Sequence, residues 1–205
     1  MSAFEFFFSF YGLLLGLSVA AIATGLALAI QNRMTMRIGY LTPLLATFVG
    51  LDIASFWDFA WTVLRDAPFS YGLLVMGLIV ALVYFVAASL VFPYAATEGQ
   101  SLDDHFWSNK RTVLLLTTVA NTLSLCLALP FVLASPDGAV LAFGYGFNLL
   151  LYVLLILPAA LAKKPRLFVI LTALHIGLYL AIAVTSVLAP SLMTMPEGTP
   201  PAAAG

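Results

Sequence analysis

The sequence carries very little charge. Only 8% of its 205 residues are Asp, Glu, Lys or Arg, whereas 63% are hydrophobic. A soluble domain carries about 25% charged residues, so this chain lacks the charge needed to cover a surface that faces water. Its single cysteine excludes a disulfide within one chain. No basic patch suits nucleic acid, and we expect the lipid bilayer to be the main partner.

Long apolar runs take the place of the missing charge. Each run is long enough to cross a bilayer as a helix, which takes about 20 residues, and none alternates as a barrel strand would. We therefore predict an all-α, multi-pass membrane protein whose single domain covers residues 1–189. The predicted spans are 10–30, 41–64, 71–92, 112–134, 139–161 and 167–189. The remaining residues, 190–205, are rich in Pro, Gly and Ala and are expected to form a disordered tail.

The cationic residues predict the orientation. Seven of the eight Lys and Arg residues lie in the first, third and fifth connections: Arg33, Arg37, Lys110, Arg111, Lys163, Lys164 and Arg166. Only Arg65 lies on the other side. Cytoplasmic loops collect Lys and Arg, so both chain termini are expected outside the cytoplasm. The third connection, 93–110, also holds Asp103, Asp104 and His105, which lack metal-ligand spacing and are interpreted as part of a solvated loop.

A polar centre is predicted inside the membrane. Asp52 lies almost midway along its span, where a charged residue costs roughly 2.5–3.5 kcal/mol on insertion scales and is a functional candidate. Polar residues at similar depth in spans two, four, five and six are expected to converge. The candidates for a proton or ion pathway are Asp52, His175, Asn121, Asn148, Ser55 and Tyr179.

Two interpretations of this centre stay open. A buried Asp52–His175 pair could pass a proton or bind a small cation or polar solute, because intramembrane Asp and His form proton relays. Polar side chains also join helices at about 0.6–2 kcal/mol each without any transport.

Two further features point to surfaces. Trp57, Asp58, Trp61 and Arg65 at the outer end of span two form either a membrane anchor, with Asp58 and Arg65 paired, or an outer vestibule. Span one repeats small residues at Gly12, Gly16 and Ala20, which suit an internal packing seam or a homo-oligomer. Spans one to three and four to six are also compatible with a 3+3 inverted repeat.

Several motifs resemble a pattern in small bacterial inner-membrane proteins. The resemblance rests on Leu90-Val91-Phe92-Pro93, on 102–106 (Leu-Asp-Asp-His-Phe), on Lys110-Arg111 and on the aromatic segment 56–61 of span two. It implies a six-helix protein of the inner membrane, and no function comes with it.

The best interpretation is a small proton- or ion-coupled transporter or channel. The alternatives are a non-catalytic subunit or scaffold of a larger membrane complex with protein partners, and a receptor or lipid-binding module. We expect no enzymatic activity, cofactor or metal, because neither a nucleophile–base pair nor a metal-ligand set is evident.

The orientation is testable with reporter fusions. A reporter that is active only outside the cytoplasm, fused to the C-terminus, should give signal, and a cytoplasm-active reporter should give none. The reverse result would mean that the number of crossings is odd or that one span is misplaced.

Overall fold

The computed structural model describes residues 3–34, 38–65, 67–68, 70–94 and 101–189, with side chains from Phe8 on. In this part of the chain all regular structure is helical: α1 (Ala3–Gln31), α2 (Leu41–Leu64), α3 (Tyr71–Ser89), α4 (Leu102–Leu133), α5 (Gly138–Leu161) and α6 (Pro165–Leu188). All six helices are long and apolar enough to cross a membrane. The prediction of an all-α protein with six membrane-spanning helices is confirmed. The predicted tail, 190–205, lies outside the described residues.

The start of α4 differs from the prediction. The helix begins at Leu102, well before Thr112, because the Ser101 side chain accepts a hydrogen bond from the Asp104 N–H at 3.2 Å and caps the helix. Asp103 and Asp104 occupy the first turn, where the helix dipole favours acidic residues. Asp103, Asp104 and His105 are therefore helical, and the solvated loop expected at 93–110 is shorter than predicted.

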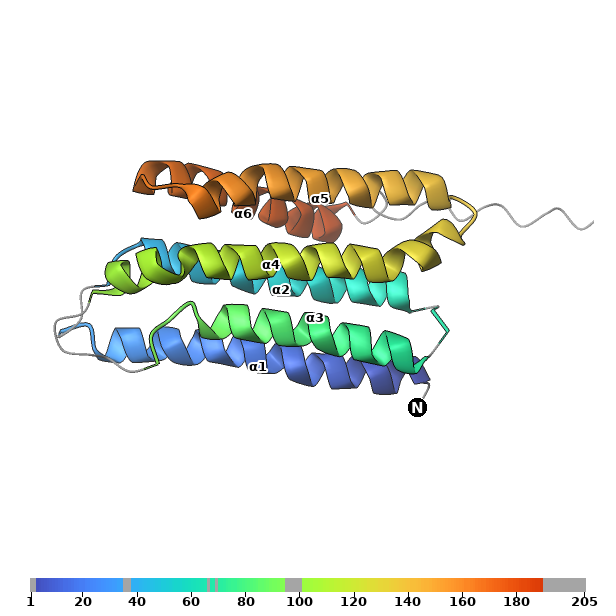
Figure 1. Cartoon of the computed structure of the whole chain (residues 1–205), viewed down its shortest axis with the longest axis horizontal. Helices are drawn as coiled ribbons and strands as arrows, with labels where there is room; N and C mark the ends of the chain where they lie inside the picture. The colour runs from blue at the N-terminus through green and yellow to red at the C-terminus, as the bar shows by residue number, and fades with distance from the viewer. Residues whose placement is uncertain (1–2, 35–37, 66, 69, 95–100, 190–205) are drawn as a thin grey trace, which may run out of the picture.

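The helices form three layers of two (Figure 1). The pair α2 and α4 lies in the middle, with α1 and α3 on one side and α5 and α6 on the other. Contacts run from α2 to α4, α4 to α5, α5 to α6 and α6 back to α2, so these four helices enclose one interior. The two halves of the chain pack differently, since α1 lies along α3 whereas α4 lies along α5. The packing thus gives no support to the inverted repeat.

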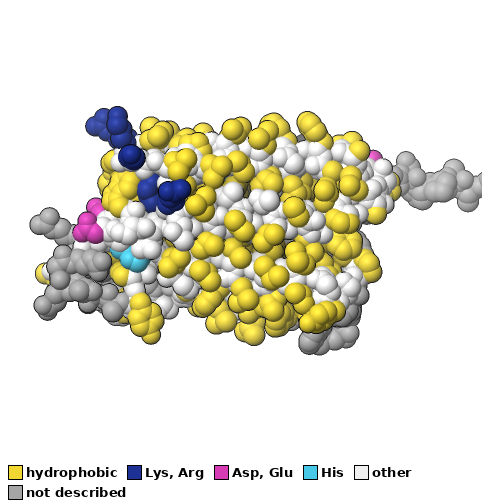
Figure 2. All heavy atoms as spheres, viewed as in Figure 1, with side chains coloured by type: hydrophobic (Ala, Val, Ile, Leu, Met, Phe, Trp, Pro, Cys, Tyr) yellow, Lys and Arg dark blue, Asp and Glu magenta, His cyan; other side chains and the backbone are white. Residues whose placement is uncertain are grey.

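The cationic side chains gather at one end of the bundle. Figure 2 shows Lys and Arg at the end where Figure 1 places the α1–α2, α3–α4 and α5–α6 connections. The opposite end holds the start of α1 and the α2–α3 and α4–α5 connections. This arrangement agrees with the charge pattern on which the predicted orientation rests, although the side of the membrane stays a prediction.

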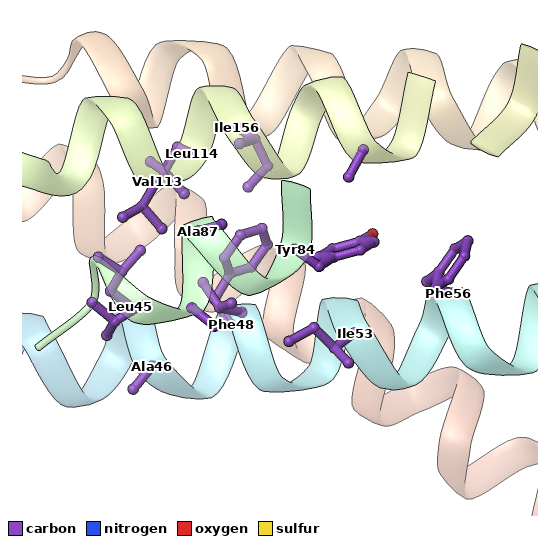
Figure 3. Packing of buried hydrophobic residues seen from close by; sticks show 14 of the residues in the cluster. Leu45, Ala46, Phe48, Ile53, Phe56, Tyr84, Ala87, Val113, Leu114 and Ile156 are labelled. Atoms are coloured by element: carbon purple, nitrogen blue, oxygen red, sulfur yellow. The ribbon is translucent and has the colours of Figure 1, made fainter. Parts of the chain in front are cut away.

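The apolar core packs around the middle layer. Phe48 of α2, Tyr84 of α3 and Leu114 of α4 are fully buried, and Figure 3 shows them between the helices. On the outer pair, the Tyr11 hydroxyl donates to the Leu73 carbonyl at 3.3 Å or the Leu74 carbonyl at 3.2 Å. A Cβ at Gly77 would overlap the Tyr11 ring, so glycine is needed for this approach of α1 to α3.

The small residues of α1 do not share one internal seam. A Cβ at Gly12 would stand 3.2 Å from the Trp57 ring, so Gly12 packs internally against α2. Gly16 has open space around it, and Ala20 is exposed. Internal packing accounts for Gly12 alone, and a homo-oligomer through Gly16 and Ala20 stays a prediction.

Lys110 is a buried cation that ties α4 to α5. Its ammonium donates to the carbonyls of Ala159 and Ala160, each at 3.2 Å, and to that of Ala162. These carbonyls lie at the end of α5, where the helix dipole is negative and the last carbonyls lack i+4 donors, although Ala159 also accepts from the Ala162 N–H at 3.3 Å. The Trp107 ring lies 4.8 Å from the ammonium. Lys110 therefore caps α5 from a neighbouring helix.

Replacing Lys110 with methionine should destabilise the protein by about 1–3 kcal/mol, because buried carbonyls lose their donor. Thermal unfolding in detergent would show this as a lower Tm. Lys164→Met is the matched control, since Lys164 is exposed at the same end of the bundle. An equal Tm for both variants would contradict the capping role.

Candidate functional site

Asp52 lies in the middle of the bundle. It is 0% exposed and comes from α2, in the central layer, on the side that faces α4, α5 and α6. Each of these three helices directs a polar side chain to its carboxyl group, as the next paragraphs describe. Asp52 is the only acidic residue among the buried side chains of the described chain.

Asn121 and Tyr179 make the closest contacts. The Asn121 amide nitrogen, from α4, donates to Oδ1 at 3.0 Å and to Oδ2 at 3.1 Å, and also to the Thr117 carbonyl at 3.0 Å. The Tyr179 hydroxyl, from α6, donates to Oδ1 at 2.6 Å. The expected contact of Asp52 with Asn121 is therefore present, and Tyr179, another candidate pathway residue, also contacts Asp52.

Tyr152 adds a contact from α5. Its hydroxyl lies 3.4 Å from Asp52 Oδ2 and 2.9 Å from Thr117 Oγ1. The Tyr84 hydroxyl of α3 is also buried and interacts with Asp52, although the pair does not reach the geometry of a normal hydrogen bond. Asp52 is thus surrounded by neutral hydroxyl and amide groups, and no cationic side chain of the described chain pairs with it.

His175 does not form the predicted pair with Asp52. It lies one turn before Tyr179 on α6, is 5% exposed, and neither ring nitrogen has a hydrogen-bond partner. The rings of Tyr179, Tyr152 and Phe48 surround it, with centroids 4.6, 5.0 and 5.6 Å away. Thr172, one turn before His175 on α6, also has a buried hydroxyl without a hydrogen-bond partner. The two side chains form a second polar group, separated from Asp52 by Tyr179.

A cavity of about 70 Å³ lies on the other side of Asp52. Asn121 and Tyr152 line it, and so do Ser55 and Asn148, two of the predicted pathway residues. Asp52 itself does not line the cavity, so Asn121 and Tyr152 separate the carboxyl group from it. A space of this size and polarity can hold a few water molecules.

A second cavity of about 360 Å³ lies nearer the end of the bundle that carries the α2–α3 and α4–α5 connections. Thr62, Ala67 and Ser135 are among its lining residues, and Tyr145 lines both cavities. The Tyr145 ring meets Phe59 of α2 edge-on, with centroids 5.3 Å apart. Tyr145 therefore lies between the two cavities, packed against Phe59.

The C-terminal end of α2 forms an aromatic cluster. Phe8 of α1 packs edge-on against Trp57 and Trp61, with ring centroids 5.6 and 5.0 Å away. The Arg65 guanidinium lies 5.7 Å from the Trp61 ring centre, whereas Asp58 is exposed and makes no ion pair with Arg65 within the described residues. The expected charge pair is replaced by a cation–π contact, which suits an anchor. None of these α2 residues lines the two cavities.

Tyr152 and Thr117 lie on the polar faces that the helical period predicts for spans five and four, one turn from Asn148 and Asn121, but they were not among the pathway candidates. Hydroxyl groups cost little in apolar helices because they can bond to their own backbone, so their presence is a weaker signal than a carboxylate.

No known protein family, characterised protein or solved structure matches this chain. The resemblance to small bacterial inner-membrane proteins stays a prediction, and the functional argument depends on the geometry alone.

Asn121→Leu should lower stability by about 1–3 kcal/mol, because Asp52 loses one of its two closest donors. Thr122→Val is the control, since the exposed Thr122 hydroxyl bonds only to the Thr118 carbonyl of its own helix. The cost should disappear when Asp52 is already Leu, as measured by Tm in a double-mutant cycle. An unchanged cost in that background would show that the two residues are not coupled.

Proposed function

We propose that this chain is a multi-pass transport protein of a bacterial inner membrane. In this proposal a proton or small cation passes through it, by coupled transport or as a channel, and Asp52 binds the cargo. The observation that carries the proposal is a buried carboxyl group that receives polar side chains from three neighbouring helices, next to a polar cavity.

The chemistry of the carboxyl group supports this proposal. Interhelical hydrogen bonds can be made by Asn, Ser, Thr or Tyr at a modest cost, whereas a carboxyl group is far more expensive at the bilayer centre. Only the carboxyl group among these side chains can bind and release a positive charge at that depth, which is the function that would offset its cost. Residues with such a cost are functional candidates by default.

The two cavities support access from one side. They lead from the end that lacks the cationic cluster towards Asn121 and Tyr152, with the Phe59–Tyr145 pair between them. On the other side of Asp52, the buried Phe48 ring packs against His175, Tyr152 and Tyr179. This conformation therefore fits a state that is approached from outside the cytoplasm and closed towards it.

The second candidate function is a subunit or scaffold without transport. Its supporting observation is that Asp52 contacts its neighbours directly and does not line the cavity, as a purely structural polar cluster would. Under this alternative the exposed face of α1 at Gly16 and Ala20 would receive a partner.

Flux measurements on purified protein in liposomes separate the two functions. Under the transport proposal, Asp52→Asn and Asp52→Leu both lower pH-dependent flux to the level of protein-free liposomes. Asp137→Asn is the control, because Asp137 is an exposed carboxylate at the start of α5 that makes no capping bond. Wild-type flux equal to that of protein-free liposomes, with a higher Tm for Asp52→Leu, would favour the scaffold.

A further inference from the structure

We infer that the cargo of Asp52 is a proton rather than a metal cation, and that Oδ2 carries it in this conformation. The inference deepens the proposed function and rests on it. It follows from the number of hydrogens available to the groups around the carboxyl and from the direction in which each is donated.

The Tyr152 hydroxyl donates its only hydrogen to Thr117, for the following reason. Thr117 Oγ1 donates its own hydrogen to the Leu114 carbonyl at 3.0 Å. Thr117 can then only accept from Tyr152, at 2.9 Å, and a phenol has one hydrogen to give. The longer contact between the Tyr152 hydroxyl and Asp52 Oδ2, at 3.4 Å, is left without a hydrogen unless Asp52 supplies it.

The remaining donors are too few for an ionised carboxylate. Asn121 has two amide hydrogens; one goes to the Thr117 carbonyl, and the other is shared between Oδ1 and Oδ2. Tyr179 gives one hydrogen to Oδ1. An ionised carboxylate has about four acceptor sites and, when buried, needs paired charge or full hydrogen bonding. Here it would have the two hydrogens of Asn121 and Tyr179 and no cation, and the Tyr84 hydroxyl would be the one further donor beside it.

A proton on Oδ2 completes the network. Asp52 then donates to Tyr152, Tyr152 donates to Thr117, and Thr117 donates to the Leu114 carbonyl. Oδ1 meanwhile accepts from Tyr179. Each hydroxyl in this series of hydrogen bonds gives one hydrogen, and the carboxyl group is neutral, which suits a buried site without a cation.

A metal cation does not suit the same surroundings. Metal ions such as Ca²⁺ are held by six or more oxygen atoms that present lone pairs. Asn121 must direct its nitrogen at Asp52, because the same atom lies 3.0 Å from the Thr117 carbonyl, which can only accept. Tyr179 also directs a hydrogen at the carboxyl group. No cluster of three or more acidic, His or Cys side chains that could hold a metal exists among the described residues.

Release of the proton passes through Tyr152, which lines the cavity of about 70 Å³. The O–H bond at Oδ2 breaks and its proton joins the Tyr152 oxygen, while Tyr152 gives its own hydrogen to a water molecule of that cavity, which leaves as hydronium. The carboxylate keeps the hydrogens of Asn121 and Tyr179, and Tyr152 now donates to Oδ2 as a third. The titratable groups that face Asp52 are Tyr84 of α3, Tyr152 of α5, and Tyr179 of α6 with His175 beside it; α4 presents only Asn121 and Thr117.

Infrared spectroscopy of the purified protein in lipid tests the protonation state directly. At neutral pH we expect the carbonyl band of a protonated carboxylic acid, shifted by ²H₂O and by ¹³C-labelled aspartate. The band should be lost in Asp52→Asn and kept in Asp58→Asn, whose carboxyl group is exposed on the same helix. Adding Na⁺ or K⁺ should change neither the band nor the Tm.

Asp52→Asn should also fold, because an amide N–H directed at Tyr152 reproduces the carboxyl hydrogen. If this variant does not fold, the aspartate isotope shift, compared between wild type and Asp58→Asn, still assigns the band. Absence of the band at neutral pH would overturn the inference, as would its loss on addition of Na⁺ or K⁺ together with a higher Tm. If the band is present but the protein shows no flux, transport is rejected and the protonated Asp52 is kept. If flux requires Na⁺ or K⁺ and the band is absent, transport is kept and the protonated Asp52 is rejected.

Discussion

The hydrogen bonds of Asp52 determine how most of this bundle is arranged. A carboxyl group among apolar helices is tolerated only where neighbouring helices satisfy it, and here Asn121, Tyr152 and Tyr179 do so from α4, α5 and α6. Apolar side chains alone give helices little preference for one neighbour over another in lipid, because lipid tails are equally apolar. The directed contacts to Asp52 therefore specify which faces of α2, α4, α5 and α6 turn inwards.

Lys110 fixes the packing of two of these helices, α4 and α5, at a different level along the bundle. Its contacts with the last carbonyls of α5 fix the end of that helix against α4, near the cationic end of the molecule. Between α1 and α3, the hydrogen bond from the Tyr11 hydroxyl to the backbone of α3 provides a similar directed contact. Each layer of the fold thus has at least one directed polar contact, and the apolar core fills the space between them.

The sequence was sufficient for the spans and for part of the site. Long apolar runs predict helices reliably, because within one continuous segment in the bilayer only a helix pairs all backbone N–H and C=O groups. The bounds of α2 are those that were expected. The early start of α4 was missed because one capping residue, Ser101, extends the helix into a polar segment. Mid-depth placement correctly related Asp52 to Asn121, whereas the contact from α6 comes from Tyr179, one turn beyond the mid-depth residue His175. It could not exclude the Asp52–His175 pair, since one helical turn on α6 decides which side chain reaches the carboxyl group.

The C-terminal half of α6 has few other attachments. After Tyr179 most of its side chains are exposed, and at this depth its hold on α2 consists of the Tyr179 contacts with Asp52 and Phe48. The atom that accepts the Tyr179 hydrogen bond belongs to the same carboxyl group that is proposed to gain and lose a proton. By reciprocal linkage, whatever changes the charge on that group changes the strength with which α6 is held, and a displacement of α6 changes how readily the group is charged. The protonation state of Asp52 and the position of α6 are therefore coupled through one equilibrium.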